Sequence, residues 1–278
     1  MKIANAPSGL SLAIQKTMVS FNTRQPLIEK PAKGEFSIKI ANTLEEREAA
    51  FMLGYKIYLE KGYITKNAQE RLIRQYDNNN ETVILIVQDR EKKVVGTATL
   101  VFGSVAKLPA EKVYFDEINA LKREGKKTAE LCRLVINPTY RNEKEILVLL
   151  FNYCAIYIHH VKRYHGLVIE VTPRHKNYYK SLLNFDEIGC EKPCPQVQNT
   201  VGVLLYLSAK KYQACVSQWS QPNNNPEKRE RSLYPYFLNA SQEKLVAYYL
   251  QKQAIPMSAE EKIYFGLSES GISRAVCV

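Results

Sequence analysis

Hydrophobic and polar residues alternate in the segment 36–43, where Phe36, Ile38 and Ile40 are separated by polar or charged residues. This period of two is typical of a strand with one buried face. Other apolar segments of strand length are bounded by turn-forming or charged residues, and the charged residues 89–93 join two of them as a hairpin loop. The further strands predicted in this way cover 82–88, 94–102, about 128–136, 167–171 and 201–207.

Helical periodicity occupies most of the intervening segments. Thr43 can cap a helix that begins at Leu44 with an acidic first turn and ends near Gly62. The segment 144–161 is apolar almost all round, which predicts a helix buried on much of its circumference. The other predicted helices cover 67–76, part of 110–124, 173–183, and about 209–219, 241–252 and 258–265.

The order of these elements predicts a mixed α/β fold. Early strands follow one another, as in antiparallel pairing, whereas later strands alternate with helices, as in a βαβ crossover. We expect an N-terminal extension at 1–34, one α/β domain at 35–209 and a helical C-terminal appendage at 210–278. The polar run at 223–226 interrupts the appendage.

Composition restricts the class of protein. No apolar run approaches the roughly 18 residues of a membrane span, and the apolar segment Leu10–Ile14 is too short for a signal peptide. The six cysteines are scattered, which favours reduced thiols in a cytoplasmic protein. Cys190 and Cys194 form the only close pair and lack further ligands nearby, so we expect no metal site.

The formal net charge of +11 indicates a polyanionic partner. No RNA-binding signature or zinc finger is present, so nucleic acid is not expected. An acidic carrier protein or a phosphorylated cofactor fits the charge equally well. The alternative is that the positive charge is simply a solvated basic surface, and this is the expectation for most individual lysines.

Two opposite charges stand inside the predicted strand at 128–136. Glu130 and Arg133 are three residues apart, so a regular strand would place them on opposite faces and bury one charge without a partner. Either a β-bulge near 131–134 brings both groups to one site, or each group meets a separate partner. Bulges often accompany active sites, although a purely structural ion pair remains an alternative.

This strand and the order of elements resemble the acyl-CoA-dependent N-acetyltransferase (GNAT) superfamily. The resemblance implies that the bulged fourth strand splays from the fifth and that an acyl-pantetheine arm enters the wedge between them. Backbone N–H groups around Leu134 and Val135 would then stabilise the oxyanion. The turn at 140–145, Tyr-Arg-Asn-Glu-Lys-Glu, lacks the glycines with which the superfamily binds the coenzyme A pyrophosphate. Its two acids would repel that group.

Within the superfamily, three segments resemble the long-chain N-acyl amino acid synthases of the FeeM type, over about residues 36–208. They are 129–136, the Asn-Pro-x-Tyr-Arg motif at 137–141, and 172–185. The chain is also similar to the LuxI-type autoinducer synthases and to exosortase-associated acyltransferases. Gly54 replaces an arginine of the LuxI type and the acidic cluster is reduced to Asp77, so S-adenosylmethionine is not expected as a substrate.

The resemblance implies transfer of a long-chain acyl group from acyl carrier protein to the α-amine of an amino acid, by direct attack on the thioester. No tightly bound cofactor is expected, and the acyl product suggests peripheral contact with a membrane. The predicted acyl site is an apolar tunnel that leads from the wedge toward the core. The alternatives are another amine acceptor, acyl-CoA as the donor, or a degenerate binding module without activity.

The expected catalytic roles fall on few residues. Glu130 would accept the proton of the attacking amine, and Arg133 would either hold Glu130 or bind the acceptor carboxylate. Tyr179 would protonate the departing thiolate; the alternatives are that Tyr178 or neither tyrosine does so, and that Tyr179 is an aromatic residue that packs the helix on the sheet. The expected substrate contacts, for which core packing is the alternative, are Tyr55, Tyr58 and Cys132, the last as a buried thiol and not a nucleophile.

Two predicted helix starts carry the cations that the resemblance assigns to the phosphopantetheine phosphate of the carrier. These cations are Arg141 and Lys144 at the first start, and Arg174, His175 and Lys176 at the second. The alternative is that both groups are simply solvated helix ends.

Overall fold

The predicted strands form one sheet in the computed structural model, which describes residues 36–104, 107–219 and 232–267. The sheet has seven strands in the order β1-β2-β3-β4-β5-β7-β6, and only the β4–β5 pair is parallel. The predicted N-terminal extension and the predicted break at 223–226 lie outside the described residues. The strands are β1 (Ser37–Ile40), β2 (Val83–Gln88), β3 (Val94–Phe102), β4 (Thr128–Ile136), β5 (Gly166–Val171), β6 (Asp186–Cys194) and β7 (Thr200–Ser208).

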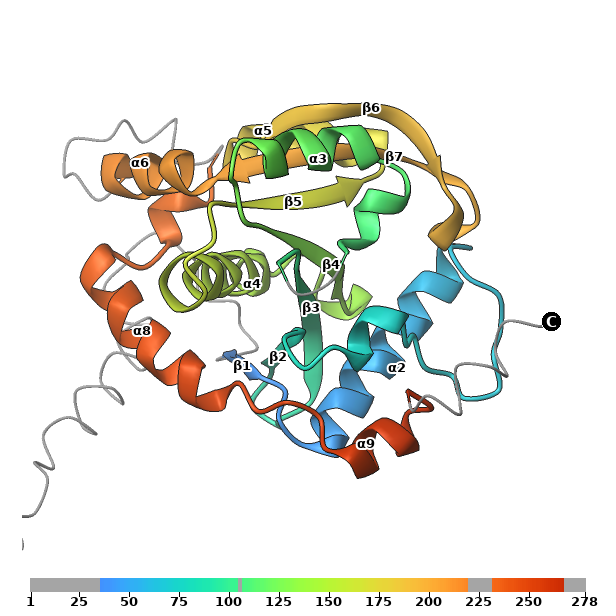
Figure 1. Ribbon diagram of the computed structural model, residues 1–278. Coiled ribbons are helices and arrows are strands. Elements are labelled where there is room, and N and C mark those ends of the chain that lie inside the picture. Colours follow the sequence, from blue (N-terminus) through green and yellow to red (C-terminus); the bar gives the residue numbers. More distant parts are fainter. Residues whose placement is uncertain (1–35, 105–106, 220–231, 268–278) are drawn as a thin grey trace, which may run out of the picture. The chain divides into compact units, whose positions relative to one another are not determined.

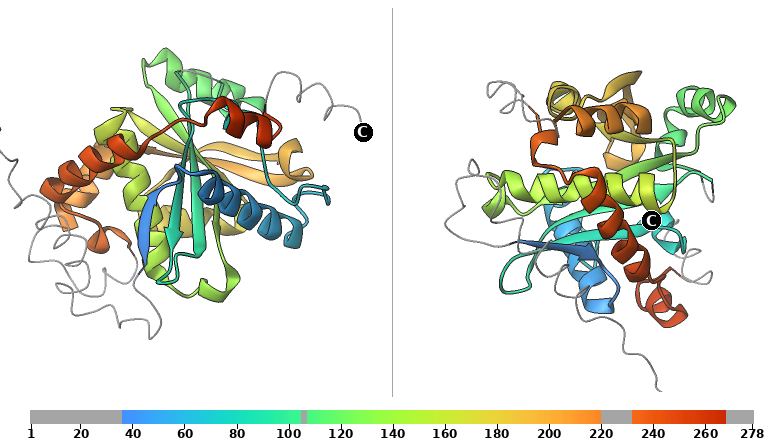
Figure 2. Two further views of the ribbon diagram at one scale, coloured as in Figure 1. Left: turned by 90° about the horizontal axis from the view of Figure 1, so that it is seen from below. Right: turned by 90° about the vertical axis from the view of Figure 1, so that its left-hand side faces the viewer.

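Helices cover both faces of the sheet (Figures 1 and 2). On one face, Leu53 and Ile57 of α2 pack against Val135 of β4. On the other face, Ile146 of α4 lies so close to Gly96 that a Cβ atom at that position would be 2.8 Å from it. The helices are α2 (Leu44–Glu60), α3 (Phe115–Arg123), α4 (Lys144–Ile156), α5 (Pro173–Leu183), α6 (Ala209–Trp219), α8 (Ala240–Gln253) and α9 (Ala259–Tyr264).

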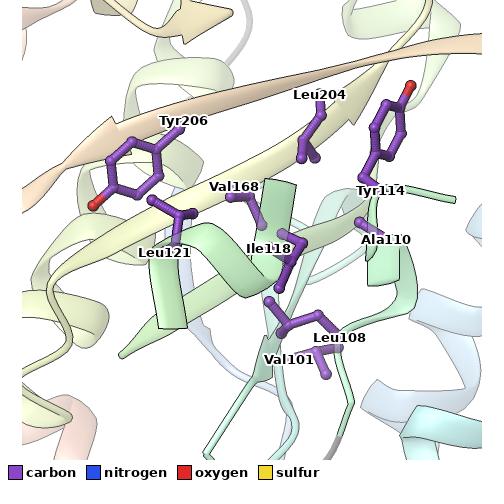
Figure 3. Packing of buried hydrophobic residues seen from close by; sticks show 9 residues of the cluster. All are labelled: Val101, Leu108, Ala110, Tyr114, Ile118, Leu121, Val168, Leu204 and Tyr206. Carbon is purple, nitrogen blue, oxygen red and sulfur yellow. The ribbon is translucent and has the colours of Figure 1, made fainter. Parts of the chain in front are cut away.

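One hydrophobic cluster lies between α3 and the sheet (Figure 3). Ile118 and Leu121 of α3 meet Val168 of β5 and Leu204 of β7, and all four side chains are buried. Each fully buried aliphatic side chain contributes about 1.5–3 kcal/mol. Leu108, Ala110 and Tyr114, which precede α3, belong to the same buried cluster, so it holds that segment against β5 and β7.

The C-terminal helices are joined to the rest of the unit by a buried polar network around Glu243 of α8. Glu243 accepts a hydrogen bond of 2.5 Å from the hydroxyl of Tyr212 and pairs at 2.9 Å with His160. Asn152 of α4 donates to the same carboxylate at 3.5 Å and accepts from the N–H of Leu238 at 3.0 Å. His160 belongs to a π-helical extension of α4 at Tyr157–Val161.

Helix α9 is attached to α2 in a similar way. Arg47 of α2 is 3% exposed and pairs with Glu261 of α9, and it also donates to the carbonyl of Ile255 at 2.7 Å. Phe265 follows α9 and packs edge-on against Phe51 at 5.0 Å between ring centroids. No helix within the described residues is both long and apolar enough to cross a membrane.

Two predictions of secondary structure were wrong. The helix expected at 67–76 is absent, and the structure has only a 3₁₀ helix, η2 (Gln75–Asn78), in its place. The N–H of Leu72 donates to the carbonyl of Phe51 at 3.0 Å and not to the carbonyl four residues before it, as it would in a helix. The second error is β6, which was missed because its polar sequence with glycine and proline lacks a strand pattern.

We expect Glu243→Ala to lower the free energy of unfolding by about 1–3 kcal/mol, because it leaves the buried hydroxyl of Tyr212 without its acceptor and removes one of the two acceptors of the Asn152 amide. Urea unfolding measures the loss. Glu191→Ala, at an exposed position of β6, serves as the control and should stay within about 0.5 kcal/mol of the wild type. A loss no larger than that of the control would show that the network does not fix the C-terminal helices.

Candidate active site

The β4 strand contains the bulge that its charge pattern predicted. Thr97 of β3 pairs with Val135 and Thr99 pairs with Cys132, so Arg133 and Leu134 together oppose the single residue Ala98. Arg133 adopts the left-handed conformation with a φ of 49°, which is unfavourable for a residue with a long side chain. The extra residue changes the alternation of faces, so Glu130 and Arg133 both point to the side of the sheet that α2 and α3 cover.

Arg133 is paired with Asp77 and not with Glu130. Its guanidinium forms a bidentate ion pair with Asp77 at 2.7 and 2.8 Å, and both side chains are buried. The remaining donors bind the carbonyl of Leu72 at 2.7 Å and the hydroxyl of Thr99 at 2.8 and 3.2 Å. All five N–H groups are therefore used, and no donor remains for Glu130 or for the carboxylate of an acceptor. Arg133 therefore neither holds Glu130 nor has a donor for an acceptor carboxylate, and its role in this structure is to stabilise the fold.

Gly54 of α2 makes room for this guanidinium. A Cβ atom at residue 54 would lie 3.3 Å from Cδ of Arg133 and 3.3 Å from a methyl group of Leu72. Arg133 also lies over the ring of Phe51 at 4.8 Å from its centroid. An arginine at position 54 would therefore displace the Arg133 side chain.

The β4 and β5 strands separate immediately after Glu130. Their parallel pairing runs from Thr128 to Glu130, whereas β4 continues to Ile136 and β5 to Val171. A cavity of about 310 Å³ lies at this separation. A cavity of about 150 Å³ can hold benzene, so this one has room well beyond an acetyl group. Its apolar wall includes Ile57, Leu72, Leu131, Val135, Phe151 and Ile169.

Glu130 lies in this cavity as a buried carboxyl group that is 3% exposed. Its Oε2 accepts a hydrogen bond of 2.8 Å from the N–H of Ala110, and its carboxyl group also bonds the thiol of Cys132. Burial raises the pKa of Glu130 from an ordinary value of 4.5 to about 8, although the two hydrogen bonds oppose the shift. A carboxyl group with such a pKa can exchange a proton near neutral pH.

Glu170 of β5 is a second carboxyl group in the same cavity, and the sequence reasoning missed it. Its Oε2 accepts a bond of 3.5 Å from the thiol of Cys194, whereas its Oε1 is buried without a hydrogen-bond partner in the described part of the chain. Burial raises its pKa. The signal that revealed Glu130, an acid within an apolar strand, is also present at Glu170 in Gly-Leu-Val-Ile-Glu-Val.

The other expected catalytic and substrate residues are only partly brought together. Leu134, Val135, Cys132, Tyr58 and Tyr179 line the cavity. Burial raises the pKa of the Tyr179 hydroxyl, and its ring packs against Phe151 at 5.8 Å between centroids. Tyr55 does not line the cavity; its hydroxyl accepts a bond of 3.3 Å from the N–H of Asn67.

Tyr178 differs from Tyr179 in its surroundings. It is 46% exposed and does not line the cavity. Of these two adjacent tyrosines, Tyr179 is therefore the one placed to meet a group bound between the strands.

The cations at the mouth of the cavity come from more elements than expected. Arg174 and His175 at the start of α5 line it, together with Lys61 after α2 and Arg74, which the sequence reasoning missed. Burial, and then the charges of Arg174 and Lys61, lower the pKa of His175. These four residues are called the basic mouth below.

The remaining three expected cations lie outside the cavity. Arg141 is exposed at 3.9 Å from Glu60, Lys144 lies over the ring of Tyr236 at 4.4 Å from its centroid, and Lys176 pairs with Glu187 at 3.1 Å. The two predicted helix starts therefore differ, because only that of α5 borders the cavity. Among the described residues, no three His, Cys, Asp or Glu side chains are grouped so that they could hold a metal ion.

We expect Asp77→Asn to lower the free energy of unfolding by about 3–5 kcal/mol, because Arg133 would keep a buried charge without its counter-ion. Thermal and urea unfolding measure the loss. Asp186→Asn is the matched control, since the Asp186 side chain is 59% exposed and pairs with Lys211 at 2.7 Å. That change should cost less than about 1 kcal/mol. Equal losses in the two variants would contradict the structural role of the Arg133–Asp77 pair.

Comparison with known proteins places this geometry in a family. The sequence model described as N-acyl amino acid synthase FeeM matches residues 49–208. The structure of FeeM, an N-acyl amino acid synthase from uncultured soil microbes, is similar with a TM-score of 0.57 and 23% identity, over 65% of this chain and 94% of that chain. The acyl-homoserine-lactone synthase LasI aligns with a TM-score of 0.49 and 15% identity, over 63% of this chain and 91% of that chain. No curated protein sequence matches. The match over more than half of the chain shows that this protein belongs to the FeeM family of N-acyl amino acid synthases and is an acyltransferase with a GNAT fold.

Proposed function

We propose that this acyltransferase moves a long-chain acyl group from acyl carrier protein to the α-amine of an amino acid. The observation that carries the proposal is the combination of features in one cavity. A buried carboxyl group, Glu130, lies at the point where β4 and β5 separate, beside an apolar wall and below the basic mouth. An acyl thioester needs an apolar wall for its chain, and an amine nucleophile needs a base close to it.

In the proposed reaction, the thioester carbonyl lies between the separated strands, with its oxygen near the backbone N–H groups of Leu134 and Val135. These groups would stabilise the oxyanion of the tetrahedral intermediate. The amine attacks the carbonyl carbon while Glu130 accepts a proton from its nitrogen. The C–S bond then breaks, and the sulfur takes a proton from the hydroxyl of Tyr179. A proton lost by the nitrogen restores that hydroxyl.

The choice of acyl carrier protein as the donor rests on charge. The acids Glu143 and Glu145 lie at the N-terminus of α4, where a coenzyme A pyrophosphate would have to bind in the usual GNAT manner. The basic mouth instead offers cations to the single phosphate of a phosphopantetheine arm. The net charge of +11 complements the acidic surface of a carrier protein.

We expect Glu130→Gln to lower kcat/KM roughly 100- to 10,000-fold, because the amide cannot accept the proton. In the wild type, kcat/KM should rise with pH and level off above about 8, where Glu130 is ionised. Because the folded pKa exceeds the ordinary value of 4.5, the wild type should lose stability as pH rises from about 4.5 to about 8, and the variant should not. Steady-state kinetics and urea unfolding across pH measure these effects. Wild-type turnover in Glu130→Gln would exclude Glu130 as the base.

Arg174→Glu should raise the KM for acyl carrier protein by about tenfold, which corresponds to one lost charge-assisted hydrogen bond. Arg141→Glu is the matched control, because Arg141 is also exposed but lies outside the cavity. Kinetics with the same acyl chain on carrier protein and on coenzyme A compare the two donors. A larger effect of Arg141→Glu, or faster turnover with acyl-CoA, would contradict the proposed donor and its site.

A further inference from the structure

Glu130 on β4 and Glu170 on β5 point to the same face of the sheet, at the place where these two strands separate. Glu130 pairs with Val168 in the parallel register, and Glu170 follows Val168 by two residues, so its side chain points to the same face. Both carboxyl groups line the cavity. Their mutual repulsion is among the causes that raise the pKa of Glu130. The cavity therefore has two acids deep inside it and cations at its mouth.

The neighbouring strands hold the Glu170 side chain in place. The thiol of Cys194 on β6 donates to Oε2 at 3.5 Å. On β7, Gly202 leaves the space that Glu170 occupies, since a Cβ atom there would lie 2.8 Å from its Cγ and 3.0 Å from its Cδ. Glu170 is half-buried, but its Oε1 is shielded from solvent and has no hydrogen-bond partner in the described part of the chain, which is costly for a carboxylate oxygen. One oxygen of the Glu170 carboxyl group is therefore held by Cys194, whereas the other lacks a donor.

An amine substrate supplies such a donor. In water near neutral pH, an α-amine is largely protonated and cannot attack a carbonyl until it loses a proton. We propose that Glu170 binds the ammonium group of the acceptor and takes the first of its protons, which leaves Glu130 to take the second during attack. This inference rests on the proposed function, because it requires an amine acceptor.

The protons balance as follows. The ammonium gives one proton to the Glu170 carboxylate and becomes a neutral amine, whose lone pair forms the bond to the carbonyl carbon. The nitrogen then gives its second proton to Glu130, the carbonyl re-forms, and the electrons of the C–S bond leave on sulfur. One of the two protons compensates for the proton that the thiol gains through Tyr179, and the other leaves to solvent.

The titratable groups around Glu170 come from three elements. They are Glu130 on β4, Cys194 on β6 and Tyr114 just before α3, and the charge of Glu170 raises the pKa of each of them. Of these, Glu130 is the group that titrates near neutral pH, because burial raises the pKa values of the Cys194 thiol and of Tyr114. A neutral side chain at position 170 should therefore lower the pKa of Glu130.

Glu170→Gln tests the proposal with the full-length enzyme and an acyl carrier protein donor. We expect the KM for the amino acid to rise about tenfold or more, and the acidic limb of the pH profile to move to lower pH. Transfer to hydroxylamine, which is uncharged at neutral pH, should be retained. Glu191→Gln, at an exposed position of β6, is the control and should match the wild type. An unchanged KM and pH profile, or equal losses with both nucleophiles, would overturn the proposal.

A second pair of variants tests the same role without changing Glu170. Cys194→Ala removes the donor to Oε2, whereas Cys194→Ser keeps a hydroxyl there. The hydrogen bond favours the ionised form of Glu170, so Cys194→Ala should raise the KM for the amino acid and Cys194→Ser should largely restore it. Equal KM values in the two variants would contradict the role. If the wild type acylates no amino acid, the proposed function fails as well, whereas an active wild type with an unaffected Glu170→Gln variant overturns this inference alone.

Discussion

The buried guanidinium of Arg133 is the constraint on which the site depends. A charge that is 3% exposed must satisfy all its donors, and its acceptors come from β3, from the segment after α2 and from η2. These bonds stabilise the bulge of β4 and attach the segment 67–78 to it through Leu72 and Asp77. The same segment then contributes Leu72, Arg74 and Tyr76 to the wall of the cavity. The structural ion pair therefore shapes the site although it takes no part in the proposed chemistry.

The cavity is lined by two kinds of polar residue, the acids of β4 and β5 and the residues of the basic mouth. Because pairing of β4 with β5 ends at Glu130, the two strands each present an acid to the space between them. Burial raises the pKa of both acids, whereas three residues of the basic mouth, Lys61, Arg174 and His175, are exposed. This arrangement is compatible with the proposed reaction, in which an anionic donor arm and an amine would meet.

The C-terminal helices complete the unit and do not line this cavity. Glu243 and Glu261 connect α8 and α9 to α4 and α2 through buried or half-buried partners. Gln253 of α8 also accepts from the N–H of Ile40 at 3.3 Å, beside the edge strand β1. An exposed strand edge invites association with other chains, so these helices protect the fold at a distance from the chemistry.

The sequence alone determined most of the sheet and the long helices, and it singled out Glu130 as an acid within an apolar strand. Strong periodicity reports local burial, and an acid inside an apolar strand is conspicuous wherever it occurs. Only the tertiary structure decided what Arg133 does, because its partner Asp77 is 56 residues away in sequence. It also replaced the helix expected at 67–76, since contacts with α2 and β4 outweigh local propensity there. The grouping of Glu170, Cys194 and the basic mouth around one cavity likewise depends on how the strands separate, which no local pattern encodes.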